Sequence, residues 1–143
     1  MDDPYNLSRF VEAQEHDYAD ALAELKRGKK SRHWIWYIFP QIAGLGYSEM
    51  SQRYAISSVD EASAYIQHRI LGARLVECTE TVIAVNGKSA EEIFGSLDAA
   101  KFRSSMTLFA EVSSGSDVFR QALVKYFDGK PDPLTGQALR GAL

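Results

Sequence analysis

Apolar side chains recur at intervals of three, four or seven residues along most of this chain, and this helical period constrains the fold more than any other feature. Between residues 7 and 27 the series includes Val11, Tyr18 and Leu22, which fall on one face of a helix. Gly28 stands where such a helix ends, because glycine adopts the left-handed conformation of a helix C-terminus without strain. The period predicts one or two amphipathic helices in this segment.

Helix starts can be located from residues that cap backbone N–H groups. The segments 58–61 and 89–92 both have a serine followed three residues later by glutamate, the spacing of a capping box, and each predicts a helix. Ser96 or Asp98 is expected to cap a further helix that extends to Val112. The other predicted helices run over residues 71–85, 117–127 and 134–139, with a junction between helices at Gln67 and His68.

The segment 33–41 is an exception, because its apolar residues are continuous and the period alone does not separate helix from strand. Pro40 ends either element, and the glycines that follow it predict a loop. Any strands should be short and lie within residues 32–56. We therefore expect a mainly α fold, in which residues 1–143 form a single compact multihelical domain of six to nine mostly short helices.

The chain has the size and composition of one globular domain, with 143 residues of which 45% are hydrophobic and 24% charged. Its net charge of −3 gives no general attraction to a phosphate backbone, so the composition argues against nucleic-acid binding. The basic cluster at 26–32 is interpreted as the solvated end of a helix or, alternatively, as an anion-binding rim.

Signals for secretion or membrane insertion are missing from the sequence. The acidic, polar first residues do not resemble a signal peptide, and the longest apolar run, at 34–39, is too short to span a bilayer. Cys78 is the single cysteine, so no internal disulfide is possible, and its place in an apolar stripe predicts a core position. We expect a soluble, cytoplasmic protein with no membrane partner.

Standard site motifs are also missing. The sequence contains no GxxxxGK[ST] phosphate loop, no HExxH, CxxC or GxSxG motif, and its three histidines lack metal-ligand spacing. We therefore expect no metal and no resident cofactor. A pair of carboxylates acting as in glycosidases stays open, because residues distant in sequence can meet in the fold.

An aromatic segment at 33–48 is the strongest candidate for a ligand site. Four large aromatic side chains fall within six positions of it, with His33 and Gln41 as polar neighbours. Rings such as those of Trp36 and Phe39 can stack on a planar ligand, and the polar groups can bind its edge. The alternative is that the aromatic residues simply pack in the core.

The helix predicted over 94–109 is a second candidate. Asp98, Lys101 and Ser105 share one of its faces, where Lys101 could neutralise a phosphate or carboxylate and Ser105 could donate a hydrogen bond. Ser104 is a poor helix former in mid-helix, which indicates packing against another element or a ligand. The alternative is an exposed ion pair between Asp98 and Lys101.

Arg74 lies near the start of a predicted helix, where the helix dipole disfavours a cation. Such a position indicates either an acidic partner, for which Glu61 is a candidate, or an anionic ligand. A structural salt bridge and a ligand contact both stay open for this side chain.

Three blocks of the sequence carry a resemblance to a known family. They are SRHWIWYIFPQIAGLGYS, HRILGARL and IFGSLDAAKFRSSMTLF, and in order and spacing they resemble the DUF1810 family from about Phe10 to Phe127. The resemblance implies a mainly helical fold and no particular reaction. The helix order is also faintly similar to that of the NADAR (YbiA-like) group, which are N-glycosidases of ribosylated or ADP-ribosylated substrates. That similarity implies a nucleotide- or ribose-type ligand.

These observations lead to one hypothesis of function, a pocket between the 33–48 and 94–109 segments that binds a small anionic, nucleotide-like or phosphoribosyl molecule. The residues expected to bind it are His33, Trp36, Phe39, Gln41, Tyr54, Arg74, Lys101, Ser104 and Ser105. If the protein is an enzyme, Glu61 or Asp98 would act in N-glycosidase chemistry. The alternative is a non-enzymatic protein-interaction module that uses the aromatic segment.

Overall fold

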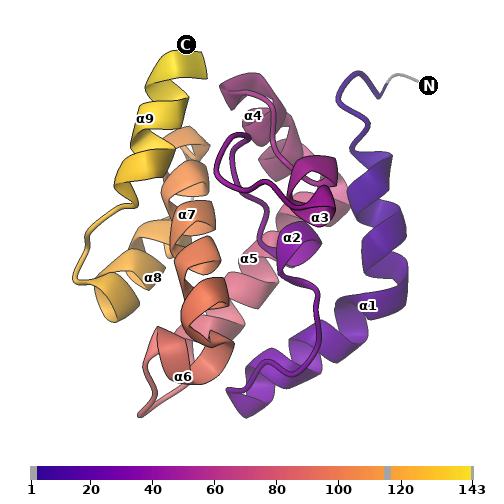
Figure 1. The fold of residues 1–143 in the computed structure, drawn as a ribbon. Coiled ribbons are helices and arrows are strands. Elements are labelled where there is room, and N and C mark those ends of the chain that lie inside the picture. Colours follow the sequence, from indigo (N-terminus) through magenta and orange to yellow (C-terminus); the bar gives the residue numbers. More distant parts are fainter. Residues whose placement is uncertain (1–2, 115–116, 143) are drawn as a thin grey trace.

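Helices form the scaffold of the chain (Figure 1). The structure, a computed structural model, describes residues 3–114 and 117–142. Its helices are α1 (Ser8–Arg27), α2 (Ile35–Ile38), α3 (Glu49–Arg53), α4 (Val59–Gln67), α5 (Arg69–Ile83), α6 (Ala90–Phe94), α7 (Ser96–Val112), α8 (Val118–Phe127) and α9 (Pro133–Ala142). These nine helices of the described residues confirm the mainly α fold. The β structure found there is an isolated parallel bridge between Ile42 and Ile56, at the edge of the range expected for strands.

The first helix is continuous and ends where the sequence predicts. Gly28 takes a φ of 73°, and its N–H bonds to the carbonyl oxygens of Glu24 and Leu25. The inner face of α1 buries Phe10 and Ala21 together with Leu25. The segment predicted to hold one or two helices is therefore a single helix, and the face of Val11, Tyr18 and Leu22 lies only partly buried at the edge of the core.

Serine side chains cap three of the later helices, α3, α4 and α6. Ser89 and Glu92 form a complete capping box at the start of α6, as their spacing predicts. Ser58 caps α4 by accepting a hydrogen bond from the N–H of Glu61 at 3.1 Å. The Glu61 side chain does not return the bond to Ser58, because it is used in an ion pair described below.

The start of α7 differs from the prediction. Gly95 alone separates α6 from α7, with a φ of 82°. The helix begins at Ser96 without a side-chain cap, so the cap predicted at Ser96 or Asp98 is wrong. The physical reason is that α6 leads directly into α7 through a glycine, which has no side chain to bind the first N–H groups.

His68 joins α4 to α5 without a loop. It ends α4 and starts α5, where its Nδ1 accepts hydrogen bonds from the N–H groups of Ile70 and Leu71, both at 3.2 Å. The sharp turn brings Gly72 against the backbone of Ile66, and a Cβ at Gly72 would lie 2.1 Å from the Ile66 carbonyl oxygen. The junction predicted here is confirmed, and the close approach explains the glycine.

Substitutions of His68 test this cap. We expect His68→Ala to lower the free energy of unfolding by about 1 kcal/mol, because two N–H groups of α5 lose their acceptor. His68→Asn should recover most of the loss, since its side-chain oxygen can accept the same bonds, and Gln67→Ala at the exposed neighbour is the control. Urea denaturation measures all three variants. Equal losses for the alanine and asparagine variants would show that capping is not the contribution of His68.

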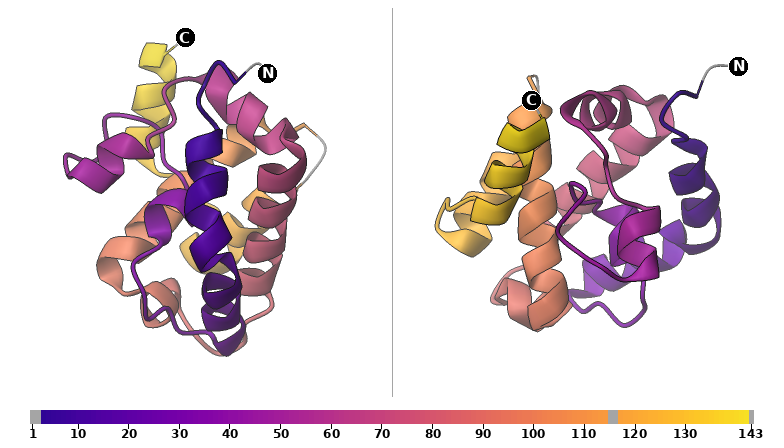
Figure 2. Two further views of the ribbon diagram at one scale, coloured as in Figure 1. Left: turned by 90° about the vertical axis from the view of Figure 1, so that its right-hand side faces the viewer. Right: turned by 45° about the horizontal axis from the view of Figure 1, so that its top comes forward.

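α7 is the central helix of the domain. It packs against α6, α8, α9, α4 and α2, while α1 packs against α5 and α2 on the other side of the molecule (Figure 1, Figure 2). α5 lies between these groups, in contact with α1, α4 and α8. The short α2 thereby bridges α1 and α7, and it carries Trp36 to the site described next.

Aromatic rings fill the centre of the core. Phe102 of α7 has its ring centre 4.9 Å from that of Phe39 and 4.7 Å from that of Phe94. Burial and the contact geometry of such rings both stabilise the fold. Cys78 is also fully buried, as predicted, and burial raises the pKa of its thiol to about 12. The thiol is therefore protonated at neutral pH and is not a nucleophile.

Candidate functional site

Charged and aromatic side chains meet where α2 packs against α7. The Nζ atom of Lys101 lies 6.0 Å from the centre of the Trp36 ring and 3.5 Å from the Asp98 carboxylate. Asp98 also forms a 2.7 Å ion pair with Lys30, which follows the end of α1. Two cations therefore share one carboxylate. We use the name α2–α7 seam for Lys30, Trp36, Asp98, Lys101 and Ser105.

Two hydrogen-bond donors of the seam are buried without a partner. Among the described residues, neither Trp36 Nε1 nor Ser105 Oγ has a hydrogen-bond partner, although both atoms are buried. Ser105 lies one turn beyond Lys101 on the same face of α7 and is fully buried. Buried polar groups are almost always satisfied in native proteins, so two unsatisfied donors in one seam indicate a place for a polar partner.

A buried carboxylate in α1 fixes the turn that leads into the seam. Glu24 accepts hydrogen bonds from the backbone N–H groups of Ser31 at 2.6 Å and Arg32 at 3.0 Å. It also accepts one from the indole N–H of Trp34 at 3.0 Å. With the turn held in this way, the Lys30 side chain reaches α7 and is only 5% exposed.

The ionisation of Glu24 is coupled to folding. Burial acts to raise its pKa, but the N–H donors of the turn outweigh burial, and the pKa of Glu24 lies below its ordinary value. The stability that the ionised carboxylate contributes is therefore complete above the pKa of an unfolded glutamate, about 4.3. That stability is lost as the pH falls through the lower pKa of the folded state.

Glu24→Gln is expected to lower the free energy of unfolding by about 2 kcal/mol at pH 7, because an amide accepts these bonds more weakly and adds buried donors. The difference from wild type should shrink as the pH falls below about 4.3. Urea denaturation at pH 7 and at about pH 3 measures both effects. Glu91→Gln, at an exposed position of α6, is the control. If the difference in free energy of unfolding between Glu24→Gln and wild type did not change with pH, the stabilising role of the ionised Glu24 carboxylate would be contradicted.

Several residues predicted to bind a ligand lie away from the seam. His33 is exposed and has no hydrogen bond or ion pair within the described residues. Gln41 borders a separate hollow of about 150 Å³, next to α3. Phe39 is fully buried in the core, and Tyr54 packs its ring on that of Tyr37 with 5.2 Å between the centres. The alternative interpretation, packing in the core, therefore describes Phe39, whereas Tyr54 is partly buried and packs against the core.

Arg74 is held by residues of α1. Its guanidinium donates to the side-chain oxygen of Gln14 at 3.3 Å and lies over the ring of Tyr18, 4.8 Å from its centre. The carboxylate that it meets is that of Glu15, at 3.9 Å. The partner expected at Glu61 is therefore wrong. Arg74 faces α1, which supplies its partners, and Glu61 pairs with Arg9 instead. A structural role accounts for Arg74.

Ser104 faces away from the seam. Its hydroxyl lies 3.1 Å from both the Asp132 carboxylate and the Ala100 carbonyl oxygen. Thr107, nearly one turn later, accepts a hydrogen bond from the Asp132 N–H at 2.8 Å. Ser104 and Thr107, both poor helix formers, thus bind the loop before α9. Of the two explanations for Ser104, another structural element or a ligand, the structure shows the first.

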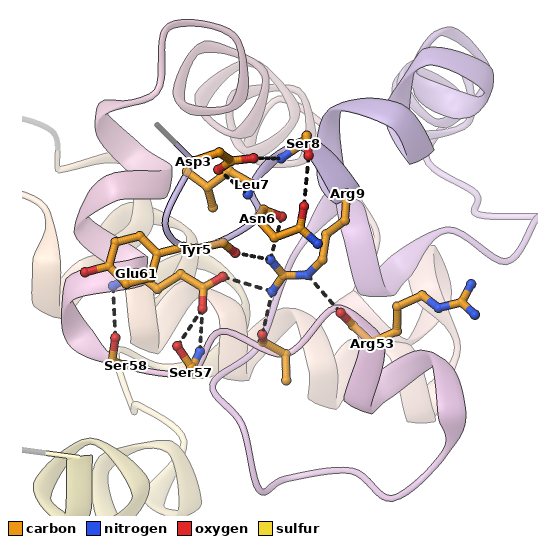
Figure 3. Close-up of polar contacts among 11 residues, drawn as sticks. Asp3, Tyr5, Asn6, Leu7, Ser8, Arg9, Arg53, Ser57, Ser58 and Glu61 are labelled. Atoms are coloured by element: carbon orange, nitrogen blue, oxygen red, sulfur yellow. Dashed lines mark hydrogen bonds and ion pairs between the residues drawn. The ribbon is translucent and has the colours of Figure 1, made fainter. Parts of the chain in front are cut away.

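Glu61 is held in a structural ion pair (Figure 3). Its carboxylate lies 2.9 Å from Arg9 of α1 and accepts hydrogen bonds from the N–H and hydroxyl of Ser57 at 2.8 and 2.7 Å. Arg9 in turn donates to the carbonyl oxygens of Arg53 and Ala55, both at 2.8 Å, and so joins α1 to the loop before α4. Glu61 is buried with both oxygens engaged, which leaves no free carboxylate oxygen for catalysis.

Removal of either partner should destabilise the fold, because the other is left as an unpaired charge. We expect Arg9→Met and Glu61→Leu each to lower the free energy of unfolding by about 3 kcal/mol, and the double variant to lose less than the sum. Denaturation in urea gives the three values. The exposed pair of Arg53 and Glu49 is the control, since its removal should have little effect. Strictly additive losses would contradict the coupling.

The seam lies apart from the hollows of about 150–620 Å³ found among the described residues. Five hollows border other parts of the described chain, and none of these five has Trp36, Lys101 or Ser105 in its wall. Among residues 3–114 and 117–142, no group of three or more His, Cys, Asp or Glu side chains is placed to hold a metal ion. In the same residues, no helix combines the length and the apolar character needed to cross a membrane.

No local sequence pattern marks Lys30 or Glu24 as a site residue. Lys30 belongs to the basic cluster at 26–32, whose two interpretations are solvated charge and an anion-binding rim. Lys26 and Lys29 are exposed, in agreement with solvated charge, whereas Lys30 is turned inward. Its partner Asp98 is far along the chain, so no local spacing reveals the pair.

These features define a mainly α domain with a cationic seam, in which two buried donors have no partner among the described residues. The sequence profile described as "Protein of unknown function (DUF1810)" matches residues 4–139, and the chain therefore belongs to the DUF1810 family. It is similar to the crystal structure of the conserved hypothetical protein Rv1873 from Mycobacterium tuberculosis, with 48% sequence identity and a TM-score of 0.95. That match covers 96% of this chain and 99% of the other. No curated protein sequence matches significantly, and the expected similarity to the NADAR group finds no support.

Proposed function

We propose that this protein binds a small anionic ligand at the α2–α7 seam. Two observations carry this. Trp36 Nε1 is buried without a partner among the described residues, next to Lys101, which shares the Asp98 carboxylate with Lys30. Ser105 Oγ, one turn beyond Lys101 on α7, is a second buried donor without a partner there. A phosphate or carboxylate oxygen can accept from such donors, and hydrogen bonds between charged groups are strong. The expected ligand is a phosphate-bearing molecule of nucleotide-like or phosphoribosyl type.

Lys101 is the side chain best placed to meet the anion. Its ammonium group has three donors, and its carboxylate neighbour Asp98 lies at 3.5 Å, longer than a close ionic hydrogen bond. Its side chain is 26% exposed, so a ligand can reach it from solvent. Lys30, in contrast, is 5% exposed and bound to Asp98 at 2.7 Å. Lys30 therefore adds positive charge to the seam from a buried position.

Trp36 offers a surface for a planar group attached to the anion. Its ring is half-buried, with Lys101 beside it. Leu97 lies one turn before Lys101 on α7 and is 80% exposed, which adds apolar surface to the same side of the helix. A nucleobase could stack on the exposed part of the indole.

Binding has more support than N-glycosidase chemistry. Hydrolysis by two carboxylates requires both to flank the scissile bond, roughly 5–9.5 Å apart. Glu61 is engaged by Arg9 and Ser57, so Asp98 is the one candidate carboxylate at the seam. Its two lysine neighbours would oppose the positive charge that develops on a sugar. We therefore propose binding alone.

A protein-interaction module built on the aromatic segment has less support. Trp34, Tyr37 and Phe39 are buried and offer little surface to a partner. Tyr47 is 87% exposed, yet single exposed apolar side chains are ordinary on protein surfaces. A ligand at the seam explains more of the structure than a protein partner does, because it also explains the unpartnered donors of Trp36 and Ser105.

Thermal-shift titration tests ligand binding, with ADP-ribose, AMP, ribose 5-phosphate and inorganic phosphate as probes. A probe at ten times its dissociation constant should stabilise the protein by about 1.4 kcal/mol, which raises the melting temperature by about 4 °C for a domain of this size. Lys101→Ala should remove the shift, because the charge that meets the anion is lost. Trp36→Phe keeps a ring but removes the N–H, and should weaken binding of the phosphate probes.

Lys26→Ala is the matched control for this experiment. It removes the same charge from the exposed end of α1 and should leave the shift unchanged. Circular dichroism verifies that each variant is folded. The absence of a shift with all four probes at millimolar concentration would contradict the proposed function, and so would equal losses in Lys26→Ala and Lys101→Ala.

A further inference from the structure

A cleft between α7, α8 and α9 is separate from the seam. It consists of two adjoining hollows of about 150 and 340 Å³, which share Thr107, Glu111 and Pro131 in their walls. α8 and α9 both pack against α7, on the side of the molecule away from α1 (Figure 1). The shared walls place the two hollows next to each other, and together they have a size that suits a small molecule.

The loop that walls the cleft, residues 128–132, is fixed to α7 by hydrogen bonds. Arg103 donates to two carbonyl oxygens of this loop, at 3.0 and 3.1 Å. The Asp132 N–H donates to the Thr107 hydroxyl at 2.8 Å. Because these bonds already hold the wall in place, a ligand need not order the loop, and binding avoids that entropic cost.

The smaller hollow has an apolar floor. Ala110, Leu123 and Val124 line it together with Pro131. Val124 is 66% exposed, so its apolar surface is accessible to a ligand. A short aliphatic group placed here would be removed from water together with this surface, which is favourable.

Charges of opposite sign border the same small hollow. Glu111 lies near the end of α7, and Arg120 lies in the first turn of α8. In the part of the chain that the structure describes, neither side chain forms an ion pair or a hydrogen bond, with the other or with any further residue. Both are therefore available to a ligand, and a molecule that carries an anionic and a cationic group would satisfy them together.

We infer that the cleft binds a small zwitterion with an apolar body, such as an α-amino acid with an aliphatic side chain. The ammonium group pairs with Glu111, the carboxylate pairs with Arg120, and the side chain covers Leu123 and Val124. A guanidinium suits this role because its planar donors match a carboxylate with two parallel hydrogen bonds. This binding is independent of the anion site at the seam.

Three probes of similar size separate the two charges. Leucine carries both, 4-methylpentanoate carries only the carboxylate, and 3-methylbutylamine carries only the ammonium group. The backbone amide signals of Gly129 and Gly136, which border the cleft, report binding in ¹H–¹⁵N NMR titrations. Leucine should bind at least about tenfold more tightly than either analogue, because each analogue lacks one charged hydrogen-bonding group.

Variants assign each charge to its partner. Glu111→Gln should make leucine and 4-methylpentanoate bind equally, and Arg120→Gln should make leucine and 3-methylbutylamine bind equally. Arg140→Gln removes a positive charge from the larger hollow and is the matched control, expected to leave leucine binding unchanged. All three positions are exposed, and circular dichroism verifies the fold.

The outcomes that would overturn the inference are distinct. They are equal affinity for the three probes, no binding of leucine at millimolar concentration, and a loss in Arg140→Gln as large as that in Arg120→Gln. Failure of the phosphate probes at the seam would not affect this result, because leucine carries no phosphate and the cleft contains neither Lys101 nor Trp36.

Discussion

The buried carboxylate of Glu24 is the contact on which the candidate site depends. It binds the turn between α1 and α2 through three N–H groups and so sets the direction in which the chain leaves α1. Lys30 and Trp36 lie on either side of this turn, and both reach α7 because of it. Burial of a carboxylate is costly unless donors surround it, and here the donors that offset the cost also shape the site.

Two different faces of α7 contribute to the two proposed sites. Asp98 and Lys101 lie beside α2, with Ser105 on their face, whereas Thr107 and Glu111 border the cleft with α8 and α9. On a helix with 3.6 residues per turn, the mean directions of these two sets differ by roughly 130°. Ser104 and Thr107 in the middle of α7 therefore have a structural role, because both form hydrogen bonds with Asp132 of the loop before α9.

The helix ends are largely predictable from local sequence. Gly28 ends α1, and Ser89 with Glu92 starts α6, because caps depend on residues within four positions of one another. His68 lies at a junction for the same reason. The start of α7 at Gly95 is not predictable in this way, since it depends on how α6 leads into α7 rather than on a capping side chain.

The sequence by itself determined most of the helical segments, and hence that Lys101 and Ser105 share a face. It left α2 open between helix and strand, and α3 lies where the glycines predicted a loop. Only the tertiary structure decided that Lys30 pairs with Asp98 and that Glu61 is engaged elsewhere. The physical reason is the sequence separation over which each interaction acts. Helical period and capping act over three or four residues, whereas an ion pair depends on which helices meet, and similar apolar stripes allow many pairings.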